Sequence, residues 1–100
     1  MAQLIWTEPA LIDLDRIAEY IAIQNPHAAQ SLIQNILDKT ELLSKQPHSG
    51  KPIPEISETL YREWIIPPCR IFYKTDTKRL YILHIIRAEK EYNLHDLSQY

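Results

Sequence analysis

The stretch YREWIIPPCRIFYK, residues 61–74, carries two arginines whose placement suggests chemistry. Arg62 and Arg70 each stand near the start of an apolar run, and the two runs meet at a Pro-Pro. A charged side chain inside a strand is costly unless it lies on an open face or has a partner. Cations on an open face can bind a partner or stabilise negative charge that develops in a reaction. Alternatively both arginines are solvated, or Arg70 pairs with Glu63 or Asp76, and surface pairs are worth about 0–1 kcal/mol.

Alternation along the predicted strands groups the arginines with aromatic side chains. Successive strand residues point to opposite faces of a sheet, so Arg62 shares a face with Trp64, and Arg70 shares a face with Phe72. Arg87 ends the last predicted strand. If the two central arginines share the open side of the sheet, all five residues form one basic and aromatic patch there. The alternative for both aromatic residues is a place in the core.

The last predicted strand also holds a histidine. Alternation places Arg87 with Tyr81, Leu83 and Ile85 on one face and His84 on the other, toward the helices. A histidine in an apolar strand is more often a satisfied core residue than a general base, so the core interpretation of His84 is favoured. The four histidines are scattered along a chain with one cysteine. We therefore expect no metal ion and no cofactor.

The first half of the chain predicts a strand and two helices. Residues 2–6 are short and apolar and are followed by a turn signal, which is typical of a strand. Apolar residues at helical spacing predict a helix over about 7–23, with Thr7 as its cap. A second helix is predicted over about 26–44, with Asn25 as its cap. So short a link makes the two helices an antiparallel hairpin.

The second half predicts a loop and three strands. Residues 45–59 contain three prolines and the only glycine, and they predict a loop. Strand-like runs follow at 61–66, 70–75 and 80–86 with short connections, so an antiparallel meander is expected. Residues 88–100 predict a short helix or a loose tail. The expected fold is a single α+β domain over residues 1–100, with both helices on one face of the sheet and the other face open.

Composition and charge bear on the cellular compartment of this chain and on whether it binds nucleic acid. The 100 residues have a formal net charge of −2, with 45% hydrophobic residues. Residues 45–90 hold nine basic against five acidic residues, so the positive charge lies on the segment with the arginines. Proteins that grip nucleic acid by its phosphates usually have a more basic balance. A single cysteine, an N-terminus unlike a signal peptide and no apolar stretch near the roughly 20 residues of a membrane span predict a cytoplasmic protein.

Several segments, taken in order, resemble the RelE/ParE superfamily of bacterial type II toxins. The resemblance covers about residues 4–92, and its strength lies in the order and spacing of the segments. The segments are WTEPALIDLDRIAEYIAIQNPHAA, PHSGKPIPE, YRE, RIFY and ILHIIR. The resemblance implies a toxin that pairs with a cognate antitoxin in a hetero-oligomer. We expect a disordered antitoxin tail to fold over the sheet patch and over a groove between the helices and the sheet.

Two activities occur in this superfamily, so fold alone does not choose between them. RelE-like members cut mRNA on the ribosome, whereas ParE-like members inhibit DNA gyrase and are not nucleases. By resemblance, Arg70 and Arg87 match arginines of the nucleases, Arg62 takes the place of a strand lysine, and Tyr92 lies near a late tyrosine. If the chain is a nuclease, these four are the catalytic candidates.

Two departures weaken the nuclease interpretation. Trp64 stands where such nucleases tend to carry a basic residue, and the net charge is acidic. The ParE-like branch is therefore favoured, with DNA gyrase as the target and no catalytic residue. The expected target-binding residues are Arg62, Trp64, Arg70, Phe72, Arg87 and Tyr92. A third possibility is a non-toxic module that only binds an antitoxin-like partner.

Overall fold

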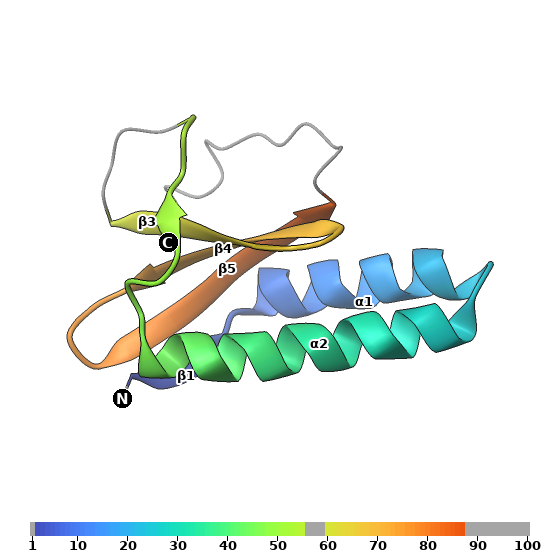
Figure 1. Cartoon of the computed structure of the whole chain (residues 1–100), viewed down its shortest axis with the longest axis horizontal. Coiled ribbons are helices and arrows are strands. Elements are labelled where there is room, and N and C mark those ends of the chain that lie inside the picture. Colours follow the sequence, from blue (N-terminus) through green and yellow to red (C-terminus); the bar gives the residue numbers. More distant parts are fainter. Residues whose placement is uncertain (1, 56–59, 88–100) are drawn as a thin grey trace.

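Two helices lie on one face of a five-stranded sheet in the computed structural model, which describes residues 2–55 and 60–87 (Figure 1). The strand order is β1-β5-β4-β3-β2, with β1 parallel to β5 and the other pairs antiparallel. The elements in chain order are β1 (Gln3–Trp6), α1 (Glu8–Ala22), α2 (Pro26–Lys45), β2 (Lys51–Pro52), β3 (Tyr61–Ile66), β4 (Cys69–Thr75) and β5 (Arg79–Arg87). This arrangement confirms the predicted α+β class. Neither helix of the described chain is long and apolar enough to cross a membrane.

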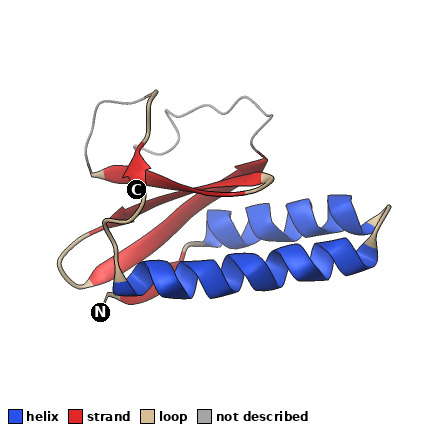
Figure 2. Ribbon diagram, viewed as in Figure 1, coloured by secondary structure: helices blue, strands red, loops and turns tan. Residues whose placement is uncertain are grey.

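The helical hairpin forms as its caps predict. The Thr7 hydroxyl accepts a hydrogen bond from the Ala10 backbone N–H at 3.4 Å, and the Asn25 side chain accepts one from the Ala28 N–H at 3.0 Å. Each cap satisfies one of the amide groups left unpaired at a helix start. A proline follows each cap within the first turn, where its missing N–H costs nothing. The two helices run antiparallel, side by side (Figure 2).

The meander is confirmed, with one strand more than expected. The three predicted strands start and end within one residue of β3, β4 and β5. The additional strand is β2, where Lys51 pairs with Glu63 and Pro52 pairs with Arg62. The prediction of an unbroken loop over residues 45–59 is therefore wrong at this point. Two residues that include a proline carry no strand pattern, so only the pairing with β3 defines them.

The sheet buries apolar side chains on both of its faces. The cluster toward the helices, called here the helix-side cluster, joins Ala10, Ile17, Leu32, Ile36, Leu43, Ile66, Cys69, Ile71, Tyr73, Leu80, Ile82 and Ile85. The far-face cluster contains no helix residue and joins Ile53, Tyr61, Phe72, Leu83 and Ile86. Phe72 and Leu83 are fully buried. The expectation of an open second face is wrong for this part of the sheet, and the core alternative for Phe72 is confirmed.

Candidate functional site

A cluster of charged side chains lies on the far face of the sheet, centred on Arg70. Its guanidinium donates from Nε to Glu63 Oε2 at 2.8 Å. It also donates from Nη1 and Nη2 to the two carboxylate oxygens of Glu55, each at 3.0 Å. Lys51 Nζ lies 3.7 Å from the other oxygen of Glu63. These four residues, Lys51, Glu55, Glu63 and Arg70, are called the Arg70 cluster below.

The strand register explains how the chain assembles the Arg70 cluster. Arg70 pairs with Ile65, so on β3 its nearest neighbours on the same face are Ile65 and Glu63. The short strand β2 then places Lys51 opposite Glu63. Pairing of Arg70 with Glu63, one of the two alternatives in the sequence, is therefore confirmed. Asp76, the other alternative, accepts backbone hydrogen bonds from residues 78 and 79 in the β4–β5 turn.

The two carboxylates of the Arg70 cluster differ in their exposure. The Glu63 side chain is 3% exposed, whereas that of Glu55 is 47% exposed. Hydrogen bonding from Arg70 lowers the pKa of the Glu55 carboxyl below its usual range. Hydrogen bonds to Glu55 and then to Glu63 raise the pKa of the Arg70 guanidinium, although burial opposes this. Both shifts arise from the same contact, which favours the charged forms of Glu55 and Arg70.

Phe72 completes the surroundings of Arg70, and Ile65 provides an exposed apolar neighbour. The guanidinium carbon of Arg70 lies 4.9 Å from the centroid of the Phe72 ring. A cation over an aromatic ring is attracted by the ring's electron-rich face. Ile65, paired with Arg70, is 41% exposed. The prediction that Arg70 and Phe72 lie together is confirmed.

Arg62 and Trp64 lie on the opposite face of the sheet from Arg70. The expectation that Arg62 and Arg70 share a face is therefore wrong. Trp64 pairs with Ile71, so Arg62 and Trp64 point toward the side of β4 that bears Ile71 and Tyr73. Trp64 packs against the helix-side cluster. Arg62 Nη1 donates to the backbone oxygen of Gly50 at 2.8 Å. This hydrogen bond joins β3 to the chain segment that leads from α2 into β2.

The same segment is fixed by a buried tyrosine. The Tyr73 hydroxyl donates to the Pro47 carbonyl at 2.8 Å and accepts from the Gly50 N–H at 2.9 Å. Burial raises the pKa of this hydroxyl, so it stays protonated and able to donate. A Cβ on Gly50 would lie 2.3 Å from the Tyr73 hydroxyl oxygen and 2.7 Å from the Glu63 carbonyl oxygen. The only glycine of the chain is therefore required by this close approach.

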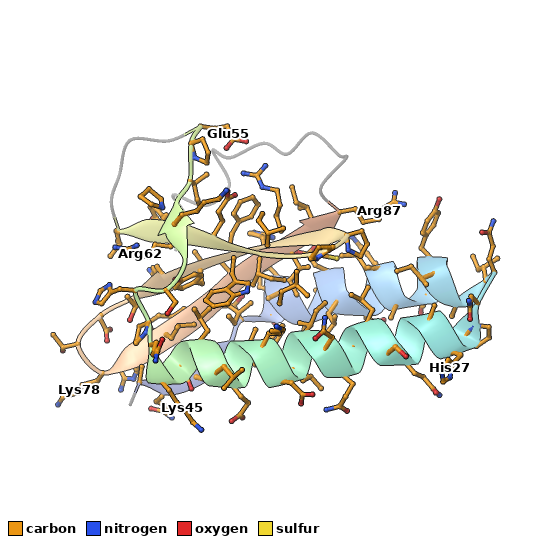
Figure 3. The ribbon with its side chains drawn as sticks, viewed as in Figure 1. His27, Lys45, Glu55, Arg62, Lys78 and Arg87 are labelled. Carbon is orange, nitrogen blue, oxygen red and sulfur yellow. The ribbon has the colours of Figure 1, made fainter. Side chains whose placement is uncertain are left out.

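Arg87 also lies apart from Arg70, which contradicts the predicted patch. Its guanidinium carbon is 4.1 Å from the centroid of the Tyr20 ring on α1. The cause is an irregularity in the β4–β5 ladder, where Tyr73 pairs with Ile82 and Phe72 pairs with His84. One additional residue on β5 interrupts the alternation on which the prediction relied. Figure 3 shows Arg62 and Arg87 at opposite ends of the sheet, and Glu55 on the side away from the helices.

The predicted approach of His84 to the helices is confirmed by its contact with α1, although its pairing partner on β4 is Phe72 of the far-face cluster. The His84 Nδ1 lies 2.9 Å from Asp13 Oδ2 on α1, and the same oxygen accepts the Ile85 N–H at 3.0 Å. This contact ties α1 to β5. Leu83 lies in the far-face cluster while Ile85 lies in the helix-side cluster, so their predicted common face is wrong. Tyr92 and the predicted element over residues 88–100 lie outside the described residues.

Sequence reasoning missed Glu55 and Lys51 and treated Glu63 only as one possible partner. The spacing of Glu63 and Arg70 across a Pro-Pro connection contained a usable signal, because a tight hairpin brings such residues close. Glu55 gave none, since it follows β2 in a proline-containing segment without periodicity. Among residues 2–55 and 60–87 no group of three or more His, Cys, Asp or Glu side chains could hold a metal ion.

Comparisons with known proteins point to one family. Residues 4–92 match the family model described as the ParE toxin of the type II toxin-antitoxin system, parDE. A curated protein of Caulobacter vibrioides named Toxin RelE2 is 31% identical over 90 residues, which are 90% of this chain and 99% of that protein. A solved structure described as the chromosomal ParDE TA system from P. aeruginosa has a TM-score of 0.71 and 27% identity, and covers 87% of this chain and 96% of its own.

Proposed function

This chain belongs to the ParE toxin family of type II toxin–antitoxin systems, and we propose that it acts in the cytoplasm, where it inhibits DNA gyrase and thereby stops DNA replication. As a toxin of this type it has a cognate antitoxin as its partner. Our proposal is that it binds gyrase as a protein ligand and performs no chemistry on a nucleic acid. The observation that carries it is the separation of Arg62, Arg70 and Arg87, each of which already has a partner within the chain.

Arginines that lie far apart cannot act together on one phosphate, which argues against RNA cleavage. Cutting RNA through its 2′-hydroxyl requires positive charge around the reacting phosphate and groups that move protons. Arg62 is bonded to a backbone carbonyl and Arg87 lies over the Tyr20 ring. Arg70 is bonded to two carboxylates, one of them buried. A phosphate approaching Arg70 would meet the negative charge of both carboxylates, which opposes phosphoryl chemistry there.

The surroundings of Arg70 favour contact with a protein instead. Protein interfaces are enriched in arginine and aromatic residues beside apolar area, with polar groups that are already satisfied. Arg70 provides an oriented guanidinium, and Ile65 provides exposed apolar area next to it. We assign the gyrase contact to this surface of β3 and β4. Of the predicted target-binding residues, Arg70 belongs to it and the buried Phe72 ring lies beneath Arg70, whereas we assign Arg62, Trp64 and Arg87 to holding the fold.

Ribosome-dependent cleavage of mRNA is the second candidate. It is favoured by one observation, the name Toxin RelE2 of the curated relative. Under this alternative Arg62, Arg70, Arg87 and Tyr92 would have to converge on one phosphate. Such convergence would need the Glu55 and Glu63 contacts of Arg70 to break and two further arginines to leave their present partners.

Purified gyrase with relaxed plasmid DNA tests the proposal. The wild-type chain is expected to inhibit supercoiling or to trap cleaved DNA on the enzyme. The variant Ile65→Ser should weaken this effect by roughly tenfold, as loss of an apolar interface contact does. Leu42→Ser is the matched control, because Leu42 is 56% exposed on α2, away from the Arg70 cluster. Full supercoiling in the presence of excess wild-type chain, or cleavage of mRNA on purified ribosomes, would contradict the proposal.

A further inference from the structure

The guanidinium of Arg70 presents two edges, and the two edges differ. The edge formed by Nε and Nη2 holds Glu63, which is 3% exposed. The end formed by Nη1 and Nη2 holds Glu55 through two parallel hydrogen bonds of 3.0 Å, and Glu55 is 47% exposed. Two parallel bonds of this kind are the geometry with which arginine recognises carboxylates. One carboxylate is therefore built into the sheet, while the other occupies a position that faces solvent.

We propose that the Nη1–Nη2 end of Arg70 is a binding site for a carboxylate of the antitoxin, and that Glu55 fills this site until the antitoxin displaces it. This inference rests on the proposed function, since it takes the antitoxin as the partner. It assigns a specific ligand group, a glutamate or aspartate side chain in an extended or helical peptide segment. It also gives Glu55 a role, that of an internal competitor which lowers the affinity of the partner.

Glu55 is replaceable and Glu63 is not, for physical reasons. An ion pair at an exposed position gains little, because water and salt screen it and because ordering two long side chains costs entropy. Exchange of Glu55 for another carboxylate conserves both hydrogen bonds of Arg70, so it requires little free energy. Removal of Glu63 would leave the partly buried Arg70 without its inner partner. Lys51, at 3.7 Å from Glu63, adds to the charge that holds Glu63 in place.

The charges of the Arg70 cluster favour a carboxylate over a phosphate chain. When Glu55 leaves, the cations Lys51 and Arg70 face one anion, Glu63, so the cluster has a single positive charge to neutralise. One carboxylate restores the balance. A nucleic-acid backbone brings one charge with every phosphate, and the neighbouring phosphates would lie close to Glu63. The exposed side chain of Ile65, opposite Arg70, gives an apolar neighbour of the acidic residue in the peptide a place to pack.

The variant Glu55→Gln tests this proposal through the affinity of the full-length toxin for the antitoxin encoded beside it, measured by calorimetry. Removal of an internal competitor raises the population of the binding-competent site, so the dissociation constant should fall roughly two- to fivefold. Glu41→Gln, an exposed residue of α2, is the matched control because it changes the net charge by the same amount. It should leave the dissociation constant unchanged.

Replacement of Arg70 itself is a second test, but Arg70→Gln alone would leave the buried Glu63 carboxylate without its partner. A paired variant avoids this. Arg70→Gln with Glu63→Gln removes the cation and its inner partner together, and its side chains can still bond to each other. In this background the antitoxin should bind two- to fivefold more weakly than it binds Glu55→Gln alone, and adding Glu55→Gln should change nothing. Unchanged or weaker binding by Glu55→Gln in the otherwise wild-type chain would overturn the proposal.

Two further outcomes separate the inference from its premise. If the wild-type chain binds no antitoxin at all, the proposed pairing fails, and the inference fails with it. If the antitoxin binds tightly but Glu55→Gln and the paired variant bind it equally well, only the inference is overturned. Tighter binding of a single-stranded 12-nucleotide RNA by Glu55→Gln, without tighter antitoxin binding, would assign the site to phosphate and would also overturn the inference.

Discussion

The two faces of the sheet use charged side chains in different ways. On the face toward the helices, Arg62 is hydrogen-bonded to the Gly50 carbonyl and Arg87 lies over a tyrosine ring of α1. His84 of β5 also contacts α1, through Asp13. Each of these contacts joins two elements of the fold. On the far face, Arg70 is bonded to a buried carboxylate and to an exposed one. The arginines of the helix side thus have partners within the fold, whereas Arg70 has one buried and one exposed partner, which is the basis for proposing it as a recognition group.

The largest effects are expected from the apolar residues beneath both faces. Ile82 and Leu83 are adjacent and fully buried, but they belong to the helix-side and the far-face cluster respectively. Ile82→Ala and Leu83→Ala should each lower the free energy of unfolding by about 2–5 kcal/mol, because each leaves a cavity. Urea unfolding measures both. If Leu83→Ala costs less than about 0.5 kcal/mol, the far face is not a second core, and the comparison of two packed faces is wrong.

The next largest effect on stability distinguishes the buried carboxylate of the Arg70 cluster, Glu63, from the exposed one, Glu55. Glu63→Gln should lower the free energy of unfolding by about 1.5–3 kcal/mol, the range for a hydrogen bond to a charged group. Glu55→Gln should cost about 0–1 kcal/mol, as an exposed pair does. The two variants remove the same charge, so each serves as the control for the other. Equal costs in urea unfolding would mean that Glu55 is as fixed as Glu63 and would remove the physical basis of exchange.

The next change in unfolding free energy is expected at Gly50, which is hydrogen-bonded to the side chains of Tyr73 and Arg62. Gly50→Ala should lower the free energy of unfolding by about 1–3 kcal/mol, because the added methyl group overlaps the Tyr73 hydroxyl and the Glu63 carbonyl. Ser49→Ala, at the exposed neighbouring position, should have an effect within about 0.5 kcal/mol. Equal stability of Gly50→Ala and the wild type would show that the segment adapts easily and that Arg62 and Tyr73 do not fix it.

The smallest effect is the pH dependence of the Glu55 contact. The pKa of the Glu55 carboxyl is lowered in the folded chain, mainly by hydrogen bonding from Arg70. Its contribution to stability is therefore fully present above the unfolded value of about 4.3 and is lost as pH falls through the lower folded value. The difference in unfolding free energy between the wild type and Glu55→Gln should stay constant from about pH 5 to 7 and disappear at lower pH. A difference that grows on acidification would contradict the contact.

Much of the fold could be predicted because its signals are local. Thr7 and Asn25 cap helices that start where the sequence predicts, and the three main strands are bounded by turn residues. The strand β2 could not be predicted, since it exists only through its pairing with β3. The faces of the arginines depend on register across strands and on one irregularity beside Phe72, and alternation along a single strand contains neither.

Only the part of the candidate site that lies within one strand could be predicted from the sequence. Arg70 and its aromatic neighbour Phe72 lie two residues apart on one strand, and the expectation that they lie together is confirmed. Glu55 reaches Arg70 from a segment distant in sequence, and such contacts leave no pattern to detect. The predicted patch of three arginines failed because the hairpin turn and the β5 irregularity set them on different faces.

Pulse labelling of DNA and protein synthesis in cells, minutes after this chain is induced without its antitoxin, tests the central claim most directly. We predict that DNA synthesis stops first while translation continues, because the separated arginines favour a protein-binding inhibitor of gyrase over a nuclease. Prior loss of translation would contradict the account and would make Arg62, Arg70, Arg87 and Tyr92 catalytic candidates again. Continued synthesis of both DNA and protein would contradict it as well, and would indicate a module that binds an antitoxin without being toxic.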